Sequence, residues 1–118
     1  RFELRLMDGS ANPYLLQAGV MAAGLFGLNN KTDPGEPLTC NMYTDYKNYP
    51  NLEKLPNDIE ESLDELDENN IIREAFGDDV INSYLKLKRK EIDDFDQNET
   101  FDKKSSVTEW EKNNTLDC

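Results

Sequence analysis

The sequence predicts a mostly α-helical chain with an N-terminal β-strand. Residues 1–6 alternate between charged and apolar side chains, an almost continuous apolar run ends at Leu28, and helix-capping patterns recur in the acidic second half. A chain of 118 residues can form one modest core and not two independent domains. We therefore expect one unit, residues 1–118, with a strand at 1–6, a buried helix at 12–28, a loop at 29–56 and an acidic helical tail at 57–118.

The opening strand is predicted from a period of two. The charged residues Arg1, Glu3 and Arg5 share one face, and Phe2, Leu4 and Leu6 share the other. One interpretation is an exposed sheet face with mixed charges. The other is a site in which Glu3 ligates a hard cation while the two guanidiniums clamp phosphate or carboxylate oxygens.

The helix at 12–28 begins where Asn12, a preferred N-cap, precedes Pro13 at the first helical position. Its residues are apolar on nearly every side, and Gly19, Ala23 and Gly27 form a stripe where another backbone could approach closely. The apolar stretch is shorter than the roughly 20 residues that span a membrane. It is therefore expected to be a core helix that other parts of the protein cover.

The segment 29–56 is expected to be a long loop, since it is rich in Asn, Asp, Pro and Gly. Tyr43, Tyr46 and Tyr49 lie within it. These tyrosines either pack the loop onto the core or belong to an exposed interaction segment.

The tail at 57–118 is expected to contain several helices. Asn57 or Asp58 caps the first, and Gly77 ends a short second one. The longest begins at Asp78 or Asp79, and its basic run, residues 86–90, is interpreted as a solvated face. A capping box formed by Ser106 and Glu109 starts the last helix, in which Val107, Trp110 and Leu116 are expected to pack inward.

Composition excludes several functions. The net charge is −12, with nearly all the acidic excess in residues 51–118, so we expect no nucleic-acid or membrane partner. The absence of histidine excludes His-based catalysis and His-ligated zinc within these residues. No phosphate-binding glycine loop or EF-hand spacing is present. Only two cysteines, Cys40 and Cys118, occur, and we expect a reducing, cytoplasmic location.

Three stretches of the sequence resemble the glutamine synthetase family. Arg1-Phe-Glu-Leu-Arg5 is similar to the last catalytic strand of that family, Arg-(Ile/Phe)-Glu-x-Arg. Asp8-Gly-Ser-Ala-Asn-Pro-Tyr-Leu15 is similar to the motif that follows it, and residues 23–31 to the end of the next helix. The resemblance is dense over residues 1–35. It implies that the chain is the C-terminal portion of an α+β catalytic domain.

The resemblance also implies a reaction and roles for the opening residues. Members of the family form γ-glutamyl phosphate from glutamate and ATP, and ammonia then displaces the phosphate. By position, Arg1 would contact nucleotide phosphate, Glu3 would ligate Mg²⁺ or Mn²⁺, and Arg5 would contact glutamate or its phosphorylated intermediate. Glutamate, ammonia and ATP are the implied substrates, and homo-oligomeric rings, with active sites between subunits, are the implied assembly.

Other parts of the family's active site are not found in this sequence. The remaining metal ligands, most ATP contacts and the loop that shields the intermediate would lie upstream. The chain also starts without Met, in the middle of the predicted strand. We therefore expect a truncated sequence and a 118-residue chain that is inactive alone.

Tyr43 is a candidate regulatory residue. In some bacterial members a tyrosine after this loop is adenylylated, and Tyr43 lies at the corresponding place in Asn41-Met-Tyr-Thr-Asp45. The following Thr44-Asp45-Tyr46 differs from the Leu-Pro-Pro type of continuation found in those members.

Two alternatives to a glutamate–ammonia ligase stay open. The protein could join glutamate to an amine other than ammonia, because acceptor specificity is set upstream. It could also be a non-enzymatic acidic helical module whose terminal helices bind a partner.

Overall fold

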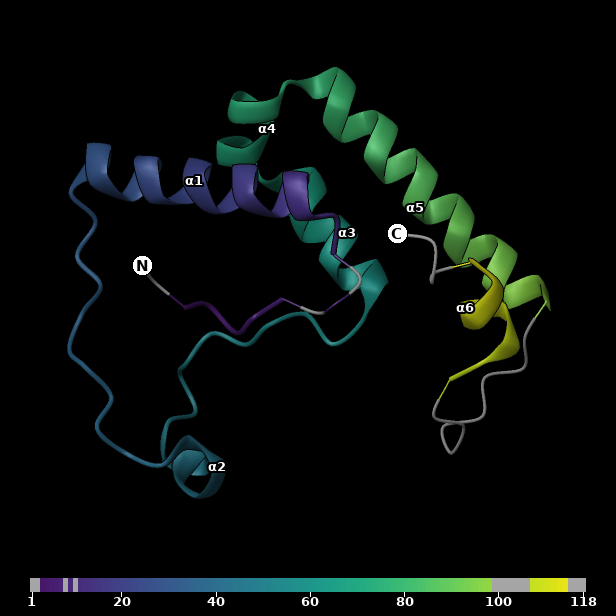
Figure 1. Cartoon of the computed structure of the whole chain (residues 1–118). Helices are drawn as coiled ribbons and strands as arrows, with labels where there is room; N and C mark the ends of the chain where they lie inside the picture. Colours follow the sequence, from purple (N-terminus) through teal and green to yellow (C-terminus); the bar gives the residue numbers. More distant parts are fainter. Residues whose placement is uncertain (1–2, 8, 10, 99–106, 115–118) are drawn as a thin grey trace.

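A computed structural model describes residues 3–7, 9, 11–98 and 107–114, and its regular elements are helices (Figure 1). They are α1 (Pro13–Asn30), α2 (Met42–Asp45), the 3₁₀ turn η1 (Tyr46–Asn48), α3 (Ile59–Glu68), α4 (Asn70–Phe76), α5 (Asp78–Asn98) and α6 (Glu109–Asn114). The mostly helical prediction is confirmed. None of the described helices is long and apolar enough to cross a bilayer.

The predicted strand at 1–6 is not found in the part that the structure describes. Residues 3–5 have no regular structure and Leu6 lies in a bend, while Arg1 and Phe2 lie outside the described residues. A strand is held by hydrogen bonds to a neighbouring strand, and the described residues include no strand that could pair with it. The α+β character expected from the family resemblance is therefore not found here.

Helix α1 starts as its sequence predicts. The Asn12 side chain accepts hydrogen bonds from the backbone N–H groups of Tyr14 (3.0 Å) and Leu15 (3.1 Å), which satisfies donors that every helix start leaves free. At the other end Lys31 adopts the left-handed conformation, with φ 51°.

The prediction that this helix is buried is wrong for the described chain: none of its residues is buried, because only α4 packs extensively against it.

A small core joins α3 and α5. Leu63, Ile81 and Leu85 are each only 4% exposed, and Leu66, Ile72, Phe76, Tyr84 and Ile92 pack around them. The residues come from one face of each amphipathic helix, as their spacing requires. Burying each of these aliphatic side chains stabilises the fold by roughly 1.5–3 kcal/mol, so this cluster is the main apolar contact between α3 and α5.

The ends of α3, α4 and α5 are set by local side chains. The Asp58 carboxylate accepts from the Glu61 N–H (2.9 Å), and Glu61 in turn accepts from the Asn57 N–H (2.8 Å). Asp58 is thus one of the two predicted N-caps, and the pair resembles a capping box in which Glu61 reaches the residue before the cap. Asn69 caps α4 through the Ile72 N–H (2.9 Å). Gly77 ends α4 with φ 83°, a conformation that glycine adopts without a steric penalty.

Arg73 connects all three of these helices. Its Nε donates to the Asp67 backbone carbonyl (2.6 Å), and its guanidinium also binds the carboxylates of Asp67 and Asp78 and the amide oxygen of Asn82. The pKa of Arg73 is raised, and the hydrogen bond to Asp78 contributes most to this shift. Asp67 and Asp64 also pair with Arg89 on α5. The network fixes α4 between the ends of α3 and α5.

Helix α6 packs on the end of α5 through an aromatic pair. The rings of Phe95 and Trp110 meet edge to face, with centroids 5.4 Å apart and an interplanar angle of 88°. The capping box that starts α6 lies two residues later than predicted: Thr108 N donates to Glu111 (2.6 Å), and Glu111 N donates to the Thr108 hydroxyl (3.1 Å). Ser106 and Leu116 lie outside the described residues. The hydrogen bonds from Thr108 lower the pKa of Glu111.

The chain between α1 and α3 is extended, with α2 and η1 away from the other helices in Figure 1. The predicted loop 29–56 thus includes the last two residues of α1 and two short helical turns. The radius of gyration is 17.1 Å, whereas a compact domain of this length has about 13.5 Å. The described fold is therefore open.

Candidate active site

Glu3 and Arg5 lie together on one side of the N-terminal segment. Arg5 Nε donates a hydrogen bond to Glu3 Oε1 at 2.5 Å, although residues 3–5 form no regular structure. Both side chains are exposed, at 85% for Arg5 and 68% for Glu3. Arg1, the third predicted member, lies outside the described residues, so the structure brings two of the three together.

The chemistry of this pair depends on what is bound. An exposed ion pair contributes little to stability, so a divalent cation can compete with Arg5 for the Glu3 carboxylate. A carboxylate is also the hard oxygen donor that magnesium and manganese prefer. Once released, the Arg5 guanidinium has a planar set of donors for a carboxylate or phosphate.

The described residues do not supply a complete metal site. They contain no group of three or more His, Cys, Asp or Glu side chains placed to hold a metal ion. Glu3 fits the role of one ligand, because its carboxylate is accessible and engaged only at the surface. The rest of the coordination shell would have to come from elsewhere.

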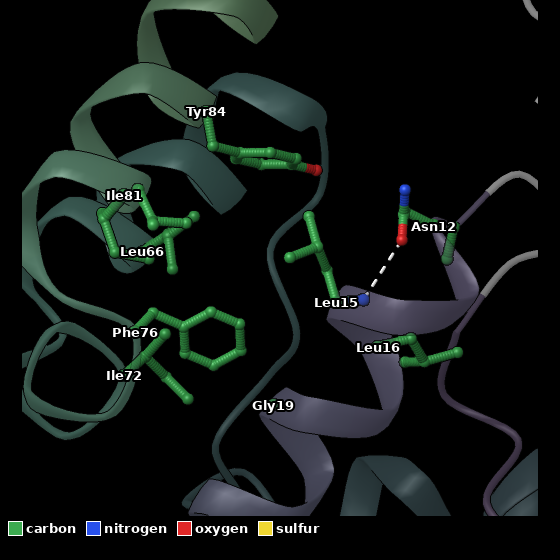
Figure 2. Close-up of a pocket in the computed structure, with 11 residues that line it drawn as sticks. Asn12, Leu15, Leu16, Gly19, Leu66, Ile72, Phe76, Ile81 and Tyr84 are labelled. Carbon is green, nitrogen blue, oxygen red and sulfur yellow. Dashed lines mark hydrogen bonds between the residues drawn. The ribbon is translucent and has the colours of Figure 1, made fainter.

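An apolar groove lies between α1 and the helical tail (Figure 2). Its volume is about 290 Å³. Leu15 points across it toward Phe76 and Tyr84, which come from α4 and α5. Sequence reasoning missed this groove: the apolar character of the helix indicates that it must be covered, but not that Ile72 and Phe76 of α4 lie on one side of it.

Tyr43 is the most exposed of the three loop tyrosines, at 96%, against 55% for Tyr46 and 37% for Tyr49. It lies in α2, whose N-cap Asn41 accepts a hydrogen bond from the Tyr43 backbone N–H (3.1 Å). Its ring is thus not packed onto the core, contrary to the packing interpretation. Tyr49 differs, because a hydrogen bond with Cys40 raises the pKa of its phenol.

Comparison with protein families matches residues 1–114 to the family described as glutamine synthetase, catalytic domain. Among curated proteins, the glutamine synthetase of Rhizobium meliloti (strain 1021) is 42% identical over 99% of this chain and 25% of its own length. That of Rhizobium leguminosarum bv. phaseoli is 38% identical over the same shares. The gamma-glutamylethanolamide synthetase GlnA4 of Streptomyces coelicolor is 35% identical over 94% of this chain and 21% of its own length.

The comparison with solved structures found no match. The chain spans about a quarter of the length of the curated relatives it matches. Nearly the whole of its sequence, including the exposed helix α1 and the acidic tail, lies within the family match. On these grounds the chain belongs to the glutamine synthetase catalytic-domain family.

Proposed function

We propose that these residues are the C-terminal part of a glutamate–ammonia ligase that makes glutamine from glutamate, ammonia and ATP. The observation that carries the proposal is the family match over residues 1–114, which includes the segment bearing Glu3 and Arg5. The Glu3–Arg5 hydrogen bond supports it further, since it places a carboxylate of the kind that ligates hard cations beside a guanidinium of the kind that binds anions.

In this proposal each opening residue has a separate task. Glu3 holds one magnesium or manganese ion, which when bound neutralises charge on the transferred phosphoryl oxygens. Arg5 orients the carboxylate of glutamate, or the acyl phosphate made from it, through its planar donors. Arg1 binds nucleotide phosphate. Cofactor and metal binding by these residues are therefore part of the proposal.

The 118-residue chain is proposed to be inactive alone. Glu3 would be one ligand of a site that needs several, and the described residues contain no group of three or more His, Cys, Asp or Glu placed to hold a metal ion. The longer protein is proposed to form homo-oligomeric rings and to act in the cytoplasm, as expected from the resemblance and the cysteine content.

A chimera tests the ligase proposal. Residues 1–118 would replace the matching quarter of the Rhizobium meliloti glutamine synthetase. We expect the folded chimera to form glutamine and phosphate from glutamate, ammonia and MgATP, while the 118-residue chain forms neither. A chimera with native-like circular dichroism and no glutamine formation would refute the proposal.

A second candidate is a ligase that joins glutamate to another amine. The 35% identity to the gamma-glutamylethanolamide synthetase favours keeping it. Because the amine is selected outside this segment, the native longer protein must be assayed, with ammonia and ethanolamine offered in parallel. Faster phosphate release with ethanolamine would favour the second candidate.

We also propose that Tyr43 is a site of adenylylation. Its 96% exposure leaves the phenol open to a modifying enzyme. Incubation with labelled ATP and an adenylyltransferase that acts on bacterial glutamine synthetases should label the wild-type chain. Tyr43→Phe should abolish labelling and Tyr46→Phe should not; labelling that survives in Tyr43→Phe contradicts the assignment.

A further inference from the structure

A polar cleft lies beside α5, next to the end of α3. Its volume is about 370 Å³, which falls within the range of roughly 300–1,000 Å³ for small-ligand sites. The side chain of Leu85, which is 4% exposed, contributes to its wall. The polar lining comes from Asp67 of α3 and from Asn82, Lys86, Arg89, Lys90 and Asp93 of α5; we call this hollow the basic cleft. Its α5 residues recur at helical spacing, so they share one face of the helix.

The basic run at residues 86–90 is divided between two sides of α5. Lys88 does not line the basic cleft. Its Nζ donates to the Glu91 carboxylate at 2.7 Å and lies 6.0 Å from the centroid of the Tyr84 ring. The other three cations of the run are exposed, as a solvated face requires, but all three lie at the same hollow.

The carboxylates of the basic cleft leave two of its cations without a counter-charge. Asp67 accepts from Arg73 through one oxygen and from Arg89 through the other. Neither Lys86 nor Lys90 forms an ion pair within the part of the chain that the structure describes. Three cations thus line this hollow with only two carboxylates, one of which is already engaged, in a chain whose net charge is −12.

The two lysines have the spacing of a ligand with two anionic groups. Residues four positions apart on a helix have Cβ atoms about 5–6 Å apart, and like charges at this spacing destabilise the helix. A ligand with two phosphoryl groups can offer one to each ammonium group and relieve this repulsion. A monocarboxylate, with one charge, cannot.

Asn82 adds a neutral donor at one end of the basic cleft. Its amide oxygen accepts a hydrogen bond from Arg73 at 3.1 Å. The group that it still has to offer a ligand is therefore its NH₂, which donates.

We propose that the basic cleft binds a small polyvalent phosphate anion, and that a diphosphate group is the chemistry it recognises. Lys86 and Lys90 supply compact point charges, and the Arg89 guanidinium supplies planar donors. The ligand is small because a nucleic acid would extend beyond the basic cleft over an acidic surface. The site uses neither Glu3 nor Arg5, so it does not rest on the proposed function.

Calorimetric titration of the 118-residue chain with inorganic pyrophosphate, without added metal ion, tests the proposal. We expect saturable binding of one pyrophosphate per chain, tighter than that of inorganic phosphate, with acetate weakest. Added sodium chloride should weaken the binding, because salt screens exposed charges. Circular dichroism checks that the chain is helical. If it is not, the chimera described above replaces it in every arm.

Matched removals of charge locate the site. The double variant Lys86→Gln/Lys90→Gln should bind pyrophosphate about tenfold more weakly or worse, since it loses two charge-assisted contacts. Lys54→Gln/Lys88→Gln removes the same charge outside the basic cleft and should change the affinity by less than about twofold.

Three results would overturn the proposal. The first is the absence of saturable pyrophosphate binding, and the second is equal weakening in the two double variants. The third concerns glycine, which is titrated in parallel because the basic cleft also contains Asp93. Tighter binding of glycine than of pyrophosphate would identify a zwitterion site instead.

Discussion

At the scale of single residues, Arg73 differs from the other basic side chains of the tail because it is largely enclosed. Its side chain is 18% exposed, while that of Arg89 is 49% exposed. Arg73 binds groups on both neighbouring helices, including Asp67 and Asp78. Hydrogen bonds to charged groups are stronger than neutral ones. The position of α4 therefore depends on Arg73 more than on Arg89.

Replacing Arg73 should show this dependence. Arg73→Ala leaves Asp67, Asp78 and Asn82 without a shared donor, so the unfolding midpoint of the chain should fall by several degrees. Arg89→Ala, which removes only the two contacts at 3.1 and 3.2 Å, serves as the control and should have a smaller effect. Thermal unfolding followed by circular dichroism measures both, and equal shifts would contradict the assigned role.

Sequence reasoning at this scale finds side chains that act locally. Asp58 and Gly77 mark helix ends as their chemistry requires. Arg73 was not singled out, because its partners lie between five and nine residues away and meet it only after α4 has folded between its neighbours. Glu3 and Arg5 share a side because an extended backbone alternates its side chains, whether or not a sheet is present.

At the scale of elements, helix α6 depends on Glu111. Its pKa is lowered by hydrogen bonds from Thr108, so its charged form is favoured in the folded chain. A lowered folded pKa gives stability that is present above the ordinary value of 4.5 and is lost as the pH falls through the folded pKa.

We expect α6 to loosen from α5 as the pH falls below about 4.5. Trp110, the single tryptophan of the chain, contacts Phe95 and reports on this packing by its fluorescence. Glu111→Gln retains a capping side chain without a titrating group, so it should lose the pH-dependent change, whereas Glu109→Gln should keep it. A change of the same size in all three chains would contradict the role of Glu111.

The α6 boundary also shows why element ends are hard to predict. Two overlapping boxes, Ser106 with Glu109 and Thr108 with Glu111, both have the required spacing. The structure uses the second. The strand predicted at 1–6 is not found among the described residues for another reason. Alternation of side chains defines a face, but a strand also needs a partner strand to pair with.

At the scale of the whole molecule, the described chain is a set of helices with a small core and one long apolar helix, α1, that has no buried residue. Only Leu63, Ile81 and Leu85 are buried hydrophobics among the described residues. The apolar run up to Leu28 predicts a helix that must be covered, and the structure leaves Tyr14, Met21, Leu25 and Leu28 of that helix exposed. The described residues include no strand, so the α+β class expected from the family resemblance is not found among them.

We propose that Glu3 belongs to the metal site of a ligase. The rate of glutamine formation would be measured against magnesium concentration in the chimera and in its Glu3→Ala variant. Glu36→Ala, which removes an exposed loop carboxylate, is the control. We predict that Glu3→Ala lowers the rate at saturating magnesium by about a hundredfold or more and that Glu36→Ala leaves it unchanged. A near wild-type rate in Glu3→Ala would contradict the claim.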